Sequence, residues 1–337
     1  MNDSMFFLGK IATAVVWPFI LIALEAVFTA HLLKALGPRW APLEVKGRHH
    51  FLVFLKQFYQ RPGPLAWRPS WRIRLIFVLF WALAFWPWIL FALAQTSLTS
   101  SASLFGGDNA LVMIILMICG ACCLFILRPA LPSLQSKYSV LRLLYHLMAA
   151  DLPLLFCLLA IYAAGQSFDL GAISQAQEVH WPSSLWNWNL WHQPLGAAAF
   201  LGIVAIKMNL APFNQIFNFA ELGAGPWQDL GTSKFYFLRL AYHAHLLLWP
   251  MLFVFFYLGG FSLLPGLDLI EVGPQGGWFL ENLSLLLKVG ALLYALSWAH
   301  YLFPSLKNED VVEWGLKFLM PAALLNWFWV LAQGWLH

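Results

Sequence analysis

The chain has 337 residues, of which 61% are apolar and 10% are charged, against about 25% charged residues in a typical soluble domain. So few polar side chains cannot cover a soluble surface, which excludes an ordinary soluble enzyme, a nucleic-acid-binding module and a disordered chain. The formal net charge is +4 at pH 7 with His neutral. The apolar runs are continuous rather than alternating, so the composition predicts an all-α polytopic membrane protein and not a β-barrel.

The apolar runs predict about eight transmembrane helices in a single membrane domain over residues 1–337. Leu75 to Ala94, for example, is a stretch of 20 residues without a charge, which is long enough to cross a hydrocarbon core of about 30 Å. Residues 45–60 are basic and aromatic, and they predict an amphipathic helix at the membrane interface. The predicted spans are 5–35, 72–98, 109–128, 141–164, 195–219, 235–263, 279–303 and 314–335.

The positions of Lys and Arg predict an orientation for these spans. Of the 19 Lys and Arg residues, 17 fall in segments predicted to lie on the same side of the membrane, and residues 34–74 alone hold nine. The connections 96–108, 165–194 and 264–279 hold no Lys or Arg. Because cytoplasmic loops carry an excess of these residues, the basic side is expected to face the cytoplasm and both termini the periplasm. The positive charge is explained by this topology, so we expect no nucleic-acid partner.

Two carboxylates fall deep inside predicted spans, Glu25 in the first and Asp151 in the fourth. A charge inside a membrane costs several kcal/mol unless it is paired or hydrated. We therefore interpret both acids as markers of a proton path or a polar cavity. His243, His245 and Lys288 also fall in predicted spans, and we interpret them as members of internal ion pairs or as side chains that reach the interface.

The sequence predicts no metal site and no cofactor carried by this chain alone. Its four cysteines lie in apolar runs with no His or carboxylate nearby, so we interpret them as small hydrophobic residues. The chain has no Gly-rich nucleotide-binding fingerprint and no cysteine set suited to an iron–sulfur cluster.

Several motifs occur in a fixed order along the spans. Glu25 is followed twelve residues later by Gly37-Pro38, and Leu141-Arg142 is followed by Asp151 nine residues after the Arg. The loop after the fifth span contains Pro212, Phe213, Asn214, Gln215, Glu221, Leu222, Asp229, Leu230 and Gly231. The C-terminal stretch contains Pro304, Lys307, Glu309, Gly315, Lys317 and Pro321. In this order and spacing the motifs resemble those of the membrane H subunit of respiratory complex I (NADH:quinone oxidoreductase) and its counterparts in membrane-bound hydrogenases.

The chain also departs from this family. Asn214, Phe217 and Phe219 stand where the family has carboxylates, whereas Glu221 and Asp229 remain. A buried carboxylate can exchange a proton when a nearby charge appears, and a Phe cannot. The resemblance therefore indicates a divergent member with fewer proton-exchanging groups.

The resemblance implies a membrane-arm subunit that docks a redox arm, lines a quinone cavity and couples redox chemistry to proton translocation. Its implied partners are other membrane-arm subunits, a peripheral redox arm and lipid in a bacterial inner membrane, with quinone bound together with a partner subunit. The implied proton path comprises Glu25, Arg142, Asp151, Glu221 and Asp229. The implied quinone cavity and docking loop comprise Lys34, Arg39, Lys56, Phe213, Asn214 and Phe217.

Two alternatives remain open. The chain could be a scaffold or anchor subunit of a complex I-related assembly, hydrogenase-like or ion-transporting, with a degenerate quinone and proton path; the missing carboxylates favour this reading. A stand-alone secondary transporter is disfavoured, because no paired broken helices or inverted halves are recognisable. Any enzyme activity would belong to the whole complex, of the NADH:quinone oxidoreductase or hydrogenase type. The sequence does not identify the electron donor or the ion moved.

Overall fold

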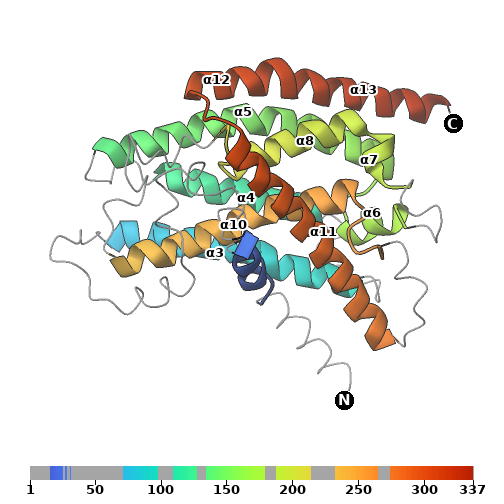
Figure 1. The fold of residues 1–337 in the computed structure, drawn as a ribbon, viewed down its shortest axis with the longest axis horizontal. Coiled ribbons are helices and arrows are strands. Elements are labelled where there is room, and N and C mark those ends of the chain that lie inside the picture. The colour runs from blue at the N-terminus through green and yellow to red at the C-terminus, as the bar shows by residue number, and fades with distance from the viewer. Residues whose placement is uncertain are drawn as a thin grey trace.

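The computed structural model describes residues 16–25, 27–28, 31, 71–97, 109–126, 134–178, 187–213, 232–264 and 274–336. Within these residues every regular element is a helix, which confirms the predicted all-α class. Most of the helices lie side by side in an elongated bundle, and α11 crosses them obliquely (Figure 1). Their bounds are as follows: α3 (Trp71–Ser97), α4 (Asn109–Ile126), α5 (Leu134–Gly165), α6 (Leu170–Ala176), α7 (Asn189–His192), α8 (Pro194–Lys207), α10 (Thr232–Tyr257), α11 (Pro274–Leu302), α12 (Asn308–Trp314), the π-helical turn η5 (Gly315–Leu319) and α13 (Met320–Leu336).

The lengths of these helices fit a membrane protein that crosses the bilayer several times. In the described part of the chain, five helices are long and apolar enough to span a membrane, and residues 16–25, 109–123 and 194–207 form shorter apolar helices. Helices suit this environment because they satisfy their backbone hydrogen bonds internally, without water. The chain is therefore a multi-pass α-helical membrane protein.

Helix α10 is the centre of the bundle. Of its apolar window Leu240–Tyr257, 89% is buried inside the protein, whereas the other four long spans are only 28–50% buried. It packs against α3, α8 and α11. Large aromatic residues that are fully buried, including Trp249, Phe255 and Phe256, form the core around it. The helices around α10 have one face toward the core and another toward the outside.

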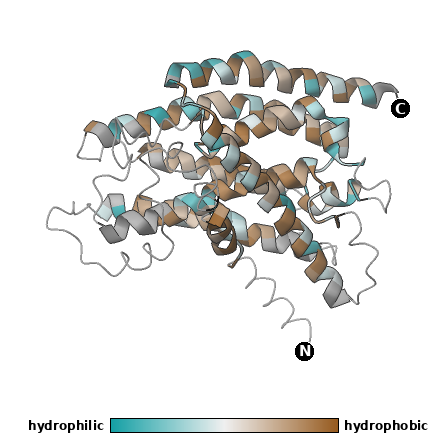
Figure 2. Ribbon diagram, viewed as in Figure 1, coloured by the Kyte–Doolittle hydropathy of each residue, from teal (hydrophilic) through white to brown (hydrophobic). Residues whose placement is uncertain are grey.

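Apolar residues run along the long helices (Figure 2), and many large apolar side chains on these helices are exposed. On α13, for example, the side chains of Leu325, Phe328 and Trp329 are 56–61% exposed. An exposed apolar surface of this kind is unstable in water but suits contact with lipid or with other membrane subunits.

The helices alternate in direction, so their ends gather at two ends of the bundle. Helices α3, α5, α10 and α12 begin toward one end, and α4, α8 and α11 run toward that end, although α8 stops in the middle of the bundle (Figure 1). We call that end the basic end, because Arg74, Lys137, Arg142, Lys307 and Lys317 all lie in or beside these helix ends. The opposite end contains α6, α7 and the turn after α10.

Two predicted spans end earlier in the structure than in the prediction. The predicted span 195–219 is a helix only to Lys207, after which residues 208–213 form a turn with Asn209 at a positive φ of 52°. The predicted span 235–263 is a helix only to Tyr257, because Gly259 and Gly260 adopt φ values of 74° and 52°, which glycine tolerates without steric cost. The predicted amphipathic helix at 45–60 lies outside the described residues.

Candidate functional site

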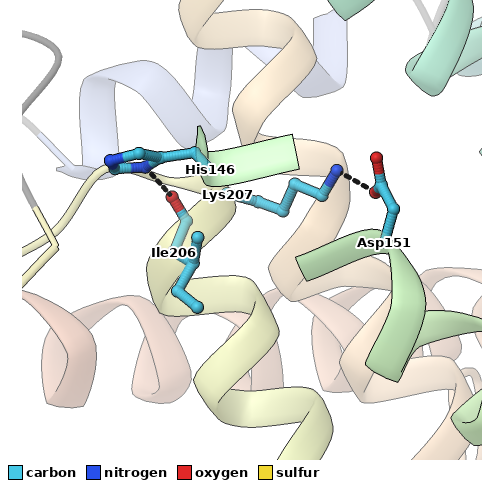
Figure 3. Close-up of polar contacts among 4 residues, drawn as sticks. All are labelled: His146, Asp151, Ile206 and Lys207. Atoms are coloured by element: carbon cyan, nitrogen blue, oxygen red, sulfur yellow. Dashed lines mark hydrogen bonds and ion pairs between the residues drawn. The ribbon is translucent and has the colours of Figure 1, made fainter. Parts of the chain in front are cut away.

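A partly buried ion pair joins α5 and α8 in the middle of the bundle. Lys207, the last residue of α8, donates a hydrogen bond from its Nζ to Oδ1 of Asp151, which lies midway along the membrane span of α5 (Figure 3). The side chains of Lys207 and Asp151 are 7% and 28% exposed. The Lys207 ammonium also lies 5.0 Å from the ring centroid of Trp249 on α10, in a cation–π contact. Asp151 and Lys207 therefore hold opposite charges together inside the apolar bundle.

A small cavity with both polar and apolar side chains in its wall lies beside this pair, between α4, α5, α8 and α10. About 20 Å³ of it is open to the centre of a water molecule, and about 10–15 Å³ is enough to hold one water. The polar residues in its wall are His146, Lys207, Asn209, Tyr242 and His245. The apolar residues in its wall are Met117, Ala121, Leu143, Leu147, Ile206, Leu246 and Trp249.

Two hydrogen bonds fix the polar side chains of this wall. The Nδ1 atom of His146 lies 3.4 Å from the carbonyl oxygen of Ile206, as Figure 3 shows. The side-chain amide of Asn209 donates from Nδ2 to the hydroxyl of Tyr242 at 2.6 Å. These bonds tie α5 to the end of α8, and the turn after α8 to α10.

The other described acid of the predicted proton path has a different partner. Glu25 Oε2 lies 3.9 Å from Nδ1 of His243 on α10. Arg142 lies on α5, nine residues before Asp151, which corresponds to about 14 Å along a helix axis. The structure therefore brings Asp151 together with Lys207 and Glu25 together with His243, while Arg142 lies nearer the basic end.

Phe213 is the one predicted docking-loop residue that falls in the described part of the chain. Its side chain is buried, and its ring packs edge-on against Trp314 with 6.2 Å between centroids. The turn before it is held in place by two hydrogen bonds: Ala211 N donates to His300 Nδ1 at 2.7 Å, and Leu306 N donates to the Pro212 carbonyl at 2.7 Å. Phe213 thus anchors the start of the loop between α8 and α10 at the basic end.

The remaining predicted site residues lie outside the described residues. They are Glu221 and Asp229 of the predicted proton path, and Lys34, Arg39, Lys56, Asn214 and Phe217 of the predicted quinone cavity and docking loop.

A second polar cluster lies at the opposite end of the bundle. The Nζ atom of Lys288 donates to the carbonyls of Gly260 and Ser262 and to the Ser262 hydroxyl, at 3.2, 2.7 and 3.0 Å. It also lies 5.0 Å from the ring centroid of Trp188. Through these contacts Lys288 holds the turn after α10 against α11.

The sequence prediction misses Lys207 as the partner of Asp151. By its position in the chain Lys207 groups with the basic residues of the cytoplasmic side, although it lies inside the predicted span 195–219. A basic residue that ends an otherwise apolar helix is the available signal. The polar wall formed by His146, Asn209 and Tyr242 comes from three helices or turns, so no local spacing could have predicted it.

Within the described residues, no group of three or more His, Cys, Asp or Glu side chains could hold a metal ion. The four cysteines are free; Cys119 and Cys122 are exposed, and Cys123 and Cys157 are buried.

The fold and this site define a polytopic helical membrane protein with a charge pair inside its bundle. A sequence model of the family described as NADH dehydrogenase matches residues 11–331. The chain therefore belongs to this family, the family of complex I membrane subunits that the motifs resemble.

Two relatives illustrate the match. The H subunit of NADH-quinone oxidoreductase from Bacillus cytotoxicus is 27% identical over 197 residues, which is 58% of this chain and 54% of that relative. The chain thus aligns with about half the length of this curated relative. A chain of the membrane-bound sulfane sulfur reductase, an archaeal respiratory membrane complex, superposes with a TM-score of 0.72 over 96% of this chain and 99% of its own length. The two are 16% identical, so this likeness shows the fold alone.

Proposed function

We propose that this chain is the membrane subunit of a complex I-like assembly, in which it docks a redox arm and couples redox chemistry to proton translocation. Its family membership over residues 11–331 supports the class of assembly. The Asp151–Lys207 pair carries the coupling part of the proposal.

Stability alone is a poor reason for a charge pair at this depth. Replacing a buried ion pair with apolar residues of similar size is often neutral or stabilising, because the desolvation cost of two charges offsets their attraction. Charged residues inside membrane spans commonly mark proton or ion pathways. Asp151 is the more exposed partner at 28%, and in this proposal its carboxylate exchanges protons with the next carrier on the path. In this proposal Glu25, Glu221 and Asp229 are further proton carriers on the same path.

The docking part of the proposal concerns the basic end. In a cytoplasmic orientation its Lys and Arg side chains would meet the redox arm, and Lys34, Arg39 and Lys56 would belong to the same surface. The buried contact of Phe213 with Trp314 holds the start of the loop that, in this proposal, lines a quinone cavity together with a partner subunit. Both termini would then face the periplasm of a bacterial inner membrane.

One observation favours the scaffold alternative. Asp151 already has a buried basic partner, Lys207, whose charge balances its own. A subunit whose charges are all neutralised in this way would anchor an assembly without moving protons.

Purification of the assembly in mild detergent tests the docking proposal. We expect the chain to copurify with an iron–sulfur redox arm, and cross-links from residues 34–74 to reach that arm. Variants Glu221→Gln and Asp229→Asn are expected to keep the assembly intact while lowering the membrane potential that quinone reduction generates in vesicles. A purified chain with no redox partner would overturn the proposal. Intact assembly with an unchanged potential would favour the scaffold alternative.

A further inference from the structure

Three buried polar atoms beside the Asp151–Lys207 pair have no hydrogen-bond partner within the described part of the chain. They are Nε2 of His146, Oδ1 of Asn209 and Nδ1 of His245. The three residues are 2%, 9% and 4% exposed and belong to α5, the turn after α8, and α10. All three line the same cavity. Buried polar atoms in native proteins nearly always have a partner, which is often an ordered water.

The hydrogen bonds that two of these residues already make determine whether their remaining polar atom donates or accepts. The Ile206 carbonyl can only accept, so His146 donates to it from Nδ1–H and keeps a lone pair on Nε2. Asn209 donates from Nδ2 to Tyr242, which leaves its Oδ1 as an acceptor. The cavity therefore presents two acceptors.

The third atom completes the pattern. A neutral imidazole can carry its proton on Nδ1, so His245 can donate into the cavity. With His245 protonated on Nδ1, a molecule that pairs with these three atoms donates two hydrogen bonds and accepts one. Water does both, and buried waters typically make about three hydrogen bonds. The cavity is large enough for one water molecule.

We propose that this cavity binds one ordered water molecule, which donates to His146 Nε2 and Asn209 Oδ1 and accepts from His245 Nδ1–H. The site connects α5, the turn after α8 and α10 through a single molecule. It goes beyond the proposed coupling role, because it follows from the hydrogen-bonding groups alone and holds for a scaffold subunit as well.

The charges around the cavity disfavour an ion as the occupant. Lys207 lines the cavity and its positive charge disfavours a metal cation, and no carboxylate is among the lining residues in the described part of the chain. An anion would face two lone pairs, on His146 Nε2 and Asn209 Oδ1, which repel a negative charge. A neutral molecule with two donors and at least one acceptor matches the wall.

Electron cryomicroscopy of the whole assembly tests the site, at a resolution where other buried waters are visible. We expect a density peak within about 2.7–3.2 Å of all three named atoms. A cavity without density, or a side chain from another part of the chain at that position, would overturn the proposal.

A pair of matched variants on α10 makes the test specific. His245→Phe removes the donor and is expected to abolish the peak. His243→Phe changes a neighbouring His that does not line the cavity, and it is expected to keep the peak. If His245→Phe does not assemble, Asn209→Gly removes one acceptor, is compatible with the positive φ at residue 209, and is expected to remove the peak from this position. A peak that persists in either cavity variant contradicts the assignment.

Discussion

Gly315 lies against the carbonyl oxygen of Ala149, so closely that a Cβ atom at residue 315 would be 2.3 Å from that oxygen. Pro153 lies four residues after Ala149 in α5 and has no N–H to bond this carbonyl. The π-helical turn that begins at Gly315 therefore packs on a stretch of α5 where one backbone hydrogen bond is missing. This contact lies two residues from Asp151 and sets how closely the C-terminal helix approaches the ion pair.

We expect Gly315→Ala to destabilise the protein, because the added methyl group must push the C-terminal helix away from α5. Overpacking of this kind typically costs about 1–3 kcal/mol. Gly277→Ala on α11 is the matched control, since its Cβ would meet no heavy atom within 4 Å, and it should be neutral or stabilising by up to about 1 kcal/mol. Thermal unfolding in detergent distinguishes the two. Equal midpoints would show that the contact does not limit packing.

The Asp151–Lys207 pair predicts strong non-additivity between substitutions. Asp151→Asn leaves the Lys207 ammonium without its carboxylate, and breaking a buried pair in this way costs about 3–5 kcal/mol. Because Asp151 is 28% exposed, the lower part of this range is expected. Adding Lys207→Met removes the unpaired charge, so the double variant should regain most of the loss.

Thermal unfolding of wild type, both single variants and the double variant gives the coupling. Glu313→Gln is a suitable control, because its i,i+4 pair with Lys317 is exposed, and such pairs contribute about 0.3–0.5 kcal/mol. Additive effects of Asp151→Asn and Lys207→Met would mean that the two side chains do not interact.

Gln177 connects the short helices at the opposite end of the bundle to α10. Its amide donates to the carbonyls of Ile173 and Phe255 and accepts from the backbone N–H groups of Asn189 and Gly259. Gln177→Leu would leave both N–H groups without an acceptor, and we expect a loss of at least about 2 kcal/mol in the free energy of unfolding. Exposed Gln175→Leu should stay within about 0.5 kcal/mol of wild type. A similar result for both variants would refute the bridging role.

The contacts of Lys288 predict that its substitution affects the turn after α10 locally. Its ammonium bonds Gly260 and Ser262, and hydrogen bonds to charged groups contribute about 1.5–3 kcal/mol. We expect Lys288→Met to speed amide hydrogen exchange in residues 258–264 by about tenfold or more, since about 1.4 kcal/mol corresponds to a factor of ten. Exchange in α5 should not change. Unaltered exchange at residues 258–264 would show that the turn holds without this ammonium.

The fold class was predictable because the membrane imposes it. Long apolar runs without charges permit little else, and the helices from Trp71–Ser97 to Met320–Leu336 begin within a few residues of most predicted spans. The sequence does not predict that two helices end at Lys207 and Tyr257, because the turns that follow them are also mostly apolar. These turns depend on a positive φ at Asn209, Gly259 and Gly260. Hydropathy does not register such a change of backbone direction.

The candidate site was predictable only in part. Asp151 was recognisable as an expensive charge in an apolar helix. Its partner Lys207 lies on another helix, 56 residues away in the chain, and the pairing follows from how α5 and α8 pack. The cavity behind the pair also depends on α10, so it became visible only when the helices were assembled.

Membrane potential per redox turnover tests the coupling claim most directly. The assembly carrying Asp151→Asn together with Lys207→Met would be compared in sealed vesicles with wild type and with Glu313→Gln. We predict that the double variant assembles and reduces quinone but loses most of the potential generated per turnover, while Glu313→Gln matches wild type. An unchanged potential per turnover in the fully assembled double variant would contradict a coupling role for this pair.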